Sequence, residues 1–226
     1  MPSVSKATLD FLNNLKENNH RDWMTDNKKT YLSSEKSLKE LYAYIENKLN
    51  EEDEIEKVKL FRINRDIRFS KDKTPYNIHR SVSFIRAGAH RRGGYYLRIE
   101  SGKSMIAGGF FNPDPADLKR IRTEFQMDAS EVQEILNNKD FKKVFGNTFD
   151  QSNAVKTAPK GFDKNDPNID LIRLKTFVVK KTFTDKEIMQ DNFGDIVANS
   201  FKLLRPYFDY MSDVLTTDLN GESLLK

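Results

Sequence analysis

Apolar residues recur every three to four positions over several stretches of the chain, which predicts amphipathic helices. The first stretch covers residues 4–17, and the most regular one lies between Leu38 and Leu49. The other stretches with this spacing are residues 21–31, a helix that begins near Pro115, residues 128–145 and residues 188–204. Helices are therefore expected near both ends of the chain.

Alternating apolar and polar positions, typical of half-buried strands, lie between these helices. Residues 81–86, 95–100 and 104–111 follow one another closely, and Ser101-Gly102 forms the tight turn between the last two. Gly108-Gly109 predicts a bulge or a close backbone approach in the third strand, and the β-branched run 177–183 adds another strand. We therefore predict a single α+β domain, residues 1–226, with an antiparallel β-meander packed against several helices.

The stretch Arg62–Tyr76 mixes charged, polar and aromatic side chains more densely than the rest of the chain. As a strand it would place Phe61, Ile63, Ile67 and Phe69 on one face. We expect a short strand that runs into a turn, because Thr74 precedes a proline and is biased towards extended geometry. Arg65 would then lie on the apolar face, where a buried charge needs a carboxylate or a ligand.

Composition excludes several functional classes. The chain of 226 residues can bury a sizeable core. It has no cysteine, which excludes a disulfide framework and a thiolate nucleophile. The first twenty residues contain no apolar signal region, and no run of eighteen apolar residues occurs. We expect a cytoplasmic protein without a membrane partner.

Positive charge is concentrated in residues 57–98, which contain twelve Lys and Arg against Asp66 and Asp72, a net charge of +10, whereas the whole chain carries +4. A basic block on an acidic remainder predicts a local anionic partner, either a phosphorylated small molecule or nucleic acid. The alternative is that the arginines pair with carboxylates elsewhere in the fold. Oligomeric state does not follow from the sequence.

Guanidinium groups bind phosphate and carboxylate bidentately, so the central stretch is the candidate site. The expected ligand-binding residues are Arg62, Asn64, Arg65, Arg68, Lys71, Lys73, Tyr76 and Arg98, with Tyr95 and Tyr96 as further stacking faces. If the protein is an enzyme, Asp66 and Asp72 are the expected catalytic residues, one of them as general base.

Metal and cofactor binding find little support in the sequence. Asp66, Asp72, His79 and Glu100 offer ligand types for a metal, but no His-Glu or His-His spacing supports a site. No cofactor is indicated.

Several segments resemble the family known as domain of unknown function 2461, found in bacteria and fungi. They are Phe61–Tyr76 with its Arg-Ile-Asn-Arg-Asp-Ile-Arg-Phe-Ser-Lys-Asp-Lys-Thr-Pro-Tyr run, Gly94–Ile99, Asn18–Trp23, Gly108–Pro113 and Lys156–Lys175. The resemblance covers nearly the whole chain and implies one domain, but it brings no activity, cofactor or catalytic residue. Arg98 stands where a histidine is frequent, so it gives no support to a catalytic histidine on that strand.

Three functions therefore stay open. The first is a binding module for an anionic ligand, and the second is an enzyme on an anionic substrate whose arginines stabilise developing charge. The third is a buried ion-pair network without a ligand. The first two require Arg62, Arg65, Arg68 and Lys73 to share one cleft, whereas the third requires each of them to have a partner.

Overall fold

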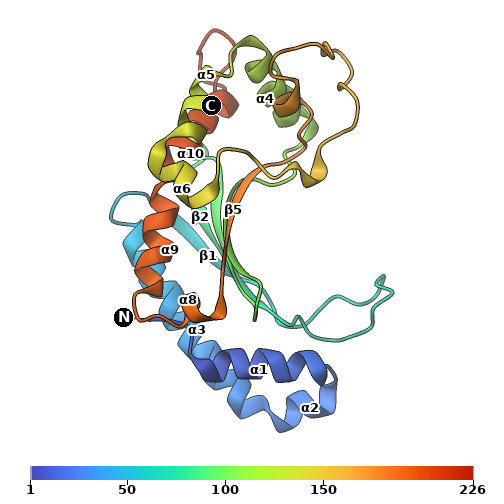
Figure 1. The fold of residues 1–226 in the computed structure, drawn as a ribbon, viewed down its shortest axis with the longest axis vertical. Coiled ribbons are helices and arrows are strands. Elements are labelled where there is room, and N and C mark those ends of the chain that lie inside the picture. Colours follow the sequence, from blue (N-terminus) through green and yellow to red (C-terminus); the bar gives the residue numbers. More distant parts are fainter. Residues whose placement is uncertain (1, 226) are drawn as a thin grey trace. The chain divides into compact units, whose positions relative to one another are not determined.

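The computed structural model describes residues 2–225 and confirms the α+β prediction, with one antiparallel sheet at its centre (Figure 1). Its strands are β1 (Ile55–Leu60), β2 (Arg80–Arg86), β3 (Gly94–Ile99), β4 (Ser104–Phe110) and β5 (Phe177–Phe183). They pair in the order β1-β2-β3-β4-β5, so each strand lies beside its neighbour in the chain. This order is the predicted meander.

Helices precede the sheet, interrupt it between β4 and β5, and follow it. The first group is α1 (Lys6–Glu17), α2 (Arg21–Asp26) and α3 (Lys28–Leu49). The second is α4 (Pro115–Met127), α5 (Ser130–Asn137), α6 (Lys139–Phe145), the 3-10 turn η1 (Gln151–Asn153) and α7 (Ile169–Ile172). The third is α8 (Asp185–Ile188), α9 (Phe193–Lys202) and α10 (Arg205–Thr216). Within residues 2–225, no helix has the length and apolar character needed to cross a membrane.

The described chain divides into two compact units. Unit 1 contains residues 2–84, 96–106 and 182–199, and unit 2 contains residues 85–95, 107–181 and 200–225. Strands β2 to β5 each have residues in both units. The division therefore crosses the sheet and does not fall at a linker.

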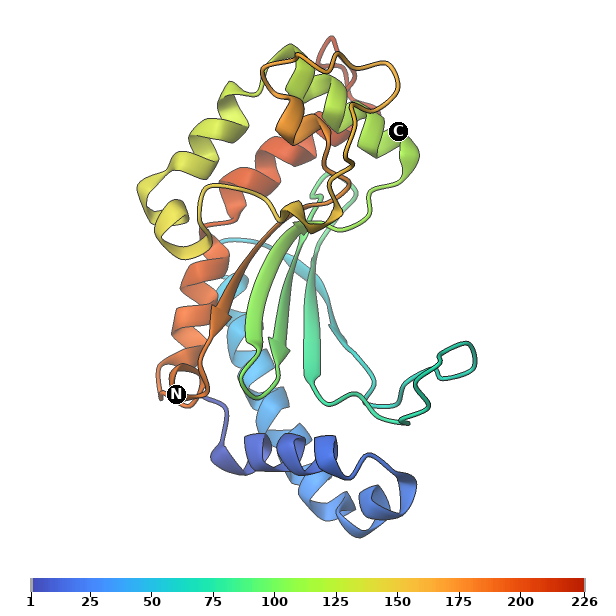
Figure 2. The ribbon, with the colours of Figure 1, turned by 45° about the vertical axis from the view of Figure 1, so that its right-hand side comes forward.

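Unit 1 is built on the packing of α1 against α3. Leu12 and Leu15 of α1 and Leu41 and Ile45 of α3 are almost fully buried, as the helical spacing predicts. Asn27 separates α2 from α3, so the predicted helix over 21–31 is two helices. Figure 2 shows these helices side by side, with a long loop projecting from the ends of β1 and β2.

Unit 2 has an aromatic core centred on Tyr95 and α10. The ring of Tyr95 lies 5.1 Å from that of Phe201 and 5.0 Å from that of Phe208. The sequence did not predict α10, because Arg205-Pro206 looked like the end of the preceding helix. Proline is tolerated in the first turn of a helix, where its missing N–H has no acceptor, and Pro206 occupies that position.

Gly109 confirms the predicted close backbone approach in β4. Its φ is +137°, and a Cβ built there would lie 2.1 Å from the carbonyl oxygen of Phe177 in β5. Only glycine fits a backbone so close to its neighbour. This position fixes how β4 meets β5.

The strand predicted within Arg62–Tyr76 is wrong. Strand β1 ends at Leu60, and residues 61–79, called the arm below, contain no strand. Ile63 is buried, but Phe69 is 95% exposed, so the apolar alternation does not mark a buried face. The sequence also missed β1, because an edge strand with exposed lysines lacks a clear alternation.

Candidate functional site

Backbone hydrogen bonds close the arm at its base. The N–H of Phe61 donates to the oxygen of Ser81 at 3.0 Å, which continues the pairing of β1 with β2. Further out, the N–H of Arg65 donates to Pro75 at 2.8 Å, next to an isolated bridge between Asn64 and Tyr76. The arm is therefore an irregular hairpin with an ordered base.

Asn19, at the corner between α1 and α2, fastens the arm to the helices of unit 1. Its amide nitrogen donates to the oxygen of Tyr76 at 2.9 Å, and its amide oxygen accepts from the N–H of Tyr76 at 3.1 Å. The next residue, His20, accepts from the N–H of Trp23 and caps α2. The Asn18–Trp23 motif thus has a structural role in positioning the arm.

Most charged residues of the arm bind one another. Arg65 Nη1 donates to Asp72 Oδ2 at 2.7 Å and to the oxygen of Thr74 at 3.0 Å. Arg68 makes two hydrogen bonds, 3.0 and 2.7 Å long, to the carboxylate of Asp66. These contacts hold the arm's own turns together, but the side chains of Asp66, Arg68 and Asp72 are more than half exposed, so the pairs are not the buried network of the third hypothesis.

The two candidate catalytic carboxylates are poor bases in this environment. Hydrogen bonds from Arg68 lower the pKa of Asp66. Hydrogen bonds from the backbone and hydroxyl of Thr74, then from Arg65, lower the pKa of Asp72. A lowered pKa stabilises the carboxylate and weakens it as a proton acceptor.

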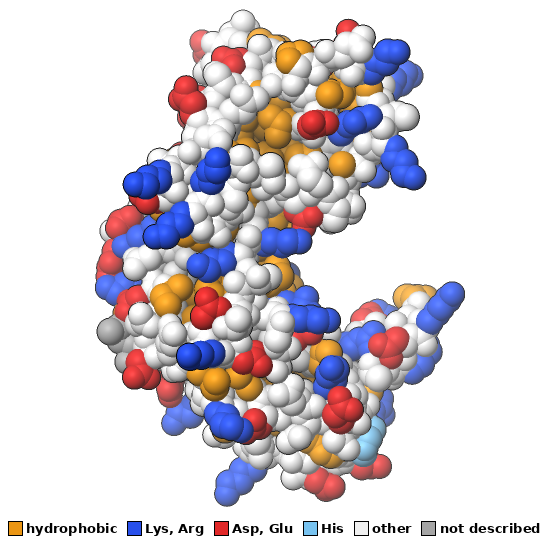
Figure 3. All heavy atoms as spheres, in the orientation of Figure 1, with side chains coloured by type: hydrophobic (Ala, Val, Ile, Leu, Met, Phe, Trp, Pro, Cys, Tyr) orange, Lys and Arg blue, Asp and Glu red, His pale blue; other side chains and the backbone are white. Residues whose placement is uncertain are grey.

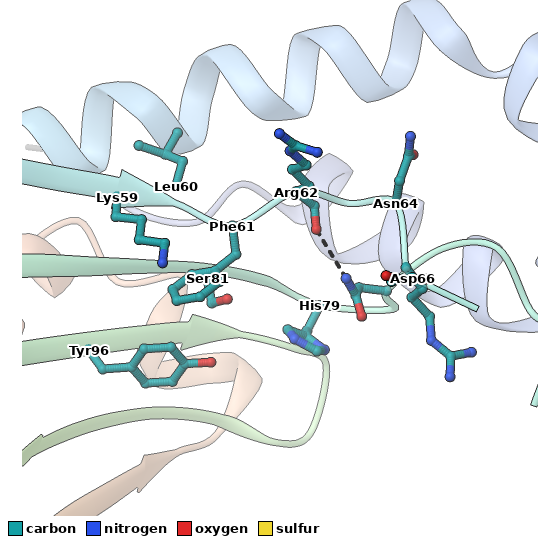
Figure 4. Close-up of a pocket in the computed structure, with 11 residues that line it drawn as sticks. Lys59, Leu60, Phe61, Arg62, Asn64, Asp66, His79, Ser81 and Tyr96 are labelled. Carbon is teal, nitrogen blue, oxygen red and sulfur yellow. Dashed lines mark hydrogen bonds between the residues drawn. The ribbon is translucent and has the colours of Figure 1, made fainter. Parts of the chain in front are cut away.

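A hollow of about 590 Å³, called the arm hollow, lies where the base of the arm meets the sheet in unit 1 (Figure 4). It is lined by Lys59, Leu60, Phe61, Arg62, Asn64, Arg65, Asp66, Asn77, His79, Ser81 and Tyr96. Four predicted site residues are in this set, namely Arg62, Asn64, Arg65 and Asp66. The other six do not line it: Arg68, Lys71, Asp72, Lys73, Tyr76 and Arg98.

The lining side chains project to two sides of the backbone. Figure 4 shows Lys59 and Phe61 on the same side as His79 at the base of the arm and as Ser81 and Tyr96 from the sheet. The side chains of Arg62 and Asn64 project to the opposite side, together with Leu60. The backbone of Arg62 contributes to the site instead, since its carbonyl accepts from Asn77 Nδ2 at 3.0 Å.

Aromatic rings and one cation form the sheet side of the hollow. The rings of Phe61 and Tyr96 meet edge to face at 6.0 Å, and the ammonium of Lys59 lies 5.3 Å from the centre of the Phe61 ring. No carboxylate within residues 2–225 pairs with Lys59. A cation held over an aromatic ring keeps its charge available to an anion.

His79 is, like Lys59, a titratable group of the hollow that the sequence did not assign to the ligand site. Burial, followed by the nearby charge of Arg98, lowers its pKa below 6.5, although Glu100 acts in the opposite direction. The imidazole is therefore neutral at pH 7 and has one nitrogen to donate and one to accept a hydrogen bond. A lone histidine without a partner at a recognisable spacing gives no signal in the sequence.

Much of the basic block proves to be structural, as the alternative interpretation allows. At least six of its twelve cations pair with carboxylates. They are Arg65, Arg68, Arg80, Arg86, Arg92 and Arg98. Tyr95 is 1% exposed and cannot serve as a stacking face. No cluster of three metal-ligating side chains occurs among the described residues.

One family's sequence model, described as a conserved hypothetical protein (DUF2461), matches residues 7–210. This range contains the arm and every residue of the arm hollow. No curated protein and no solved structure matches the chain.

Proposed function

The chain belongs to the DUF2461 family of conserved hypothetical proteins, whose description names no activity, and we propose that it binds an anionic ligand with a planar ring in the arm hollow. The observation that supports this proposal is the group Lys59, Phe61 and Tyr96. It places an ammonium without a carboxylate partner beside two aromatic rings on an open surface. Such a group complements a ligand that has both a ring and a negative charge.

Polar groups around the rings complete the proposed site. Asp66 is held by both guanidinium contacts of Arg68, so its charge is offset before a ligand arrives. Arg65 uses Nη1 for Asp72 and Thr74, and its other guanidinium nitrogens have no partner within residues 2–225. Neutral His79 and the hydroxyl of Ser81 add hydrogen-bonding groups without negative charge. The charges and hydrogen-bonding groups that line the hollow together favour an anionic ligand.

Binding is favoured over catalysis by Asp66 or Asp72. Both carboxylates are exposed and carry lowered pKa values, whereas a general base works best with a pKa near the operating pH. Asp72 also lies outside the lining of the hollow. The hydrogen bonds of Asp66 and Asp72 lie within the arm, which favours a role in stabilising its turns.

Calorimetric titration with AMP, ribose 5-phosphate and adenosine tests the proposal. AMP should bind more tightly than either fragment, because it alone supplies both ring and phosphate. Lys59→Gln should weaken AMP binding about tenfold, the size of one charge-assisted contact. Lys57→Gln is the matched control, since Lys57 is an exposed lysine on the same strand that does not line the hollow.

The Arg62→Gln variant tests whether the Arg62 side chain binds the ligand, as the sequence predicted, or takes no part, as the proposed site implies. Because the Arg62 side chain projects away from the rings, this change should weaken AMP binding by less than about twofold. The proposal fails if none of the probes binds at about 10 mM, well above the Kd expected for such contacts. It also fails if Lys59→Gln and Lys57→Gln bind AMP equally well.

A single-stranded oligonucleotide distinguishes nucleic acid from a small ligand. If the arm's exposed cations follow a phosphate backbone, affinity should fall steeply between about 50 and 200 mM salt. Lys71→Gln should then reduce the salt dependence, because Lys71 is exposed on the arm outside the hollow. Binding of AMP without binding of the oligonucleotide would restrict the ligand to a small molecule.

A further inference from the structure

A second hollow, of about 690 Å³, lies within unit 2 between α4 and the loop that follows α6 and η1. One wall, from α4, consists of Pro115, Leu118, Lys119, Arg122, Thr123 and Gln126, and the other is the run Pro159–Phe162. We call it the α4 hollow. Figure 3 shows hydrophobic, basic and acidic side chains close together over this part of unit 2. The second wall belongs to the Lys156–Asp163 motif, which the arm hollow does not use.

A defined turn shapes the loop wall. The N–H of Phe162 donates to the oxygen of Pro159 at 3.1 Å, and Gly161 has a φ of +89°. Glycine at the third position after a proline at the first is compatible with a type II turn, in which that position requires a positive φ. The motif Pro-Lys-Gly-Phe therefore specifies a turn that carries Lys160 at the edge of the hollow.

Three cations and no carboxylate line the α4 hollow. The cations are Lys119, Arg122 and Lys160. None of them forms an ion pair with a carboxylate in the part of the chain that the structure describes. Like charges around one concavity repel each other unless an anion compensates them.

Arg122 is unusual among the arginines. Five described arginines have a buried Nε without a hydrogen-bond partner: Arg98, Arg120, Arg122, Arg173 and Arg205. Four of these five have a carboxylate within 4.0 Å of the guanidinium, and Arg122 is the exception. Its Nη2 donates a 2.9 Å hydrogen bond to the oxygen of Leu174.

Arg122 is half-buried, and no carboxylate within the described residues pairs with it. Desolvation lowers the pKa of its guanidinium, and no neighbouring charge opposes the shift. Partial desolvation of an ion is unfavourable without a paired anion. The geometry of the hollow leaves room for that anion beside Arg122.

The rest of the lining is mostly apolar, apart from the uncharged polar side chains of Thr123 and Gln126. Leu118, Pro115, Pro159 and Phe162 contribute side chains without charge, and Leu118 and Phe162 are half-buried. A ligand that filled the hollow would therefore meet cations and apolar surface together. Small-molecule sites commonly combine an apolar lining with a few polar groups that fix orientation.

We infer that the α4 hollow is a second binding site, for a small molecule that carries a phosphate or carboxylate on an apolar, ring-sized body. Arg122 and Lys160 bind the oxyanion, and Phe162 and Leu118 pack against the body. The guanidinium fork suits either anion, since both offer two oxygens in a plane. This site lies in unit 2, so it does not depend on the proposal for the arm hollow in unit 1.

Titrations followed by backbone amide NMR test this inference. The probes are phenyl phosphate, benzoate, inorganic phosphate and benzyl alcohol, which separate the anion from the ring. Phenyl phosphate or benzoate should shift the amides of residues 118–126 and 160–162, and should bind at least about fivefold more tightly than inorganic phosphate or benzyl alcohol. Whichever of the two binds more tightly identifies the preferred anion. Shifts confined to residues 59–66 would report the arm hollow alone and would overturn the inference.

Lys160→Gln is the main variant, because Lys160 is exposed at a turn and its loss should leave the fold intact. Binding of phenyl phosphate should weaken about threefold to tenfold. Lys164→Gln is the matched control, an exposed lysine of the same loop outside the hollow. Arg122→Gln should cause a larger loss, and Lys59→Gln none.

Three results would overturn the inference. The first is no amide shift at about 10 mM of any probe, above the Kd expected for ligands of this size. The second is equal binding by the Lys160→Gln and Lys164→Gln variants. The third is benzyl alcohol binding as tightly as phenyl phosphate, because the cations would then contribute nothing.

Discussion

Arg80 in β2 and Glu35 in α3 form a largely buried ion pair in unit 1, with 7% and 15% of their side chains exposed. Two guanidinium nitrogens contact the carboxylate, at 2.5 and 2.8 Å. A bidentate pair of this kind fixes α3 to β2, the second strand of the sheet. Removing one partner leaves the other charge buried and unpaired.

Glu35→Gln should therefore lower the free energy of unfolding by about 3 kcal/mol. Urea denaturation followed by circular dichroism measures the change. Glu40→Gln is the control, because Glu40 is exposed on the same helix and should change stability by less than about 0.5 kcal/mol. Equal stability of the two variants would show that the buried pair contributes nothing.

Asp150 and Lys180 provide a pH-dependent contribution within unit 2. The ammonium of Lys180, at 2.7 Å, and hydrogen bonds from Ser152 hold the pKa of Asp150 at about 2, below its usual 3.8. Because the folded-state pKa is lower, the carboxylate contacts stabilise the protein above about pH 4, and this stabilisation is lost as the pH falls towards 2.

Lys180→Met should lower the free energy of unfolding by about 1 kcal/mol at pH 6, a value reduced for solvent screening because Lys180 is half-exposed. The difference from the wild type should shrink between pH 4 and pH 2. Denaturation curves across this range measure it, with the exposed Lys175→Met as control. A deficit that stays constant down to pH 2 would exclude an origin in the Asp150 charge.

At the scale of single elements, the close approach at Gly109 explains why β4 needs a glycine there. Any Cβ would collide with backbone, which cannot rotate away as a side chain does. Gly102, in the β3–β4 turn, also has a positive φ of +69°, but no atom lies within 4 Å of a Cβ built there. A side chain at Gly109 would cause both steric collision and backbone strain, whereas a side chain at Gly102 would cause backbone strain alone.

Gly109→Ala should destabilise the protein by about 3 kcal/mol or more, since collision and strain act together. Gly102→Ala should cost only about 1 kcal/mol, the strain of a left-handed residue with a Cβ. Thermal melts of the two variants test the comparison. The interpretation of Gly109 is wrong if both variants melt at the same temperature.

Most elements of the fold are predictable from the sequence because their periodicity comes from burial on one face. The strand 177–183 and the packed helices α1 and α3 follow this rule. Two of the elements that the sequence missed do not follow it. Strand β1 lies at the sheet edge with its lysines exposed, and α10 contains a proline that looks like a helix end but is accepted in the first turn.

The site was less predictable than the fold, and the arm shows why. The composition of Arg62–Tyr76 identified a segment that contributes to the hollow. The positions of charged residues along the sequence, however, do not reveal which of them form ion pairs. Arg65 and Arg68 find carboxylates within the arm itself. Lys59 and His79 reach the hollow from outside the marked stretch, through pairing of β1 with β2 that periodicity did not show.

At the scale of the whole molecule, four continuous strands run through residues of both units. Because β2 to β5 each have residues in both, neither unit retains a complete sheet if the other unfolds. We therefore expect a single cooperative unfolding transition, with coincident probes. Trp23, the one tryptophan of the sequence, reports on unit 1, and the methyl group of buried Met211 reports on unit 2.

Urea titration monitored by Trp23 fluorescence and by the Met211 methyl NMR signal tests this expectation. The two midpoints should agree within experimental error. Separate midpoints would mean that the units unfold independently despite the continuous strands.

The exposed tip of the arm has a practical consequence for labelling the protein. Residues 68–71 lie beyond the contacts that close the base, and Phe69 is almost fully exposed. Lengthening a surface loop costs little entropy, about 0.6 kcal/mol for each doubling of its length. A short epitope inserted between Phe69 and Ser70 should therefore be displayed for antibody capture while the rest of unit 1 keeps its fold.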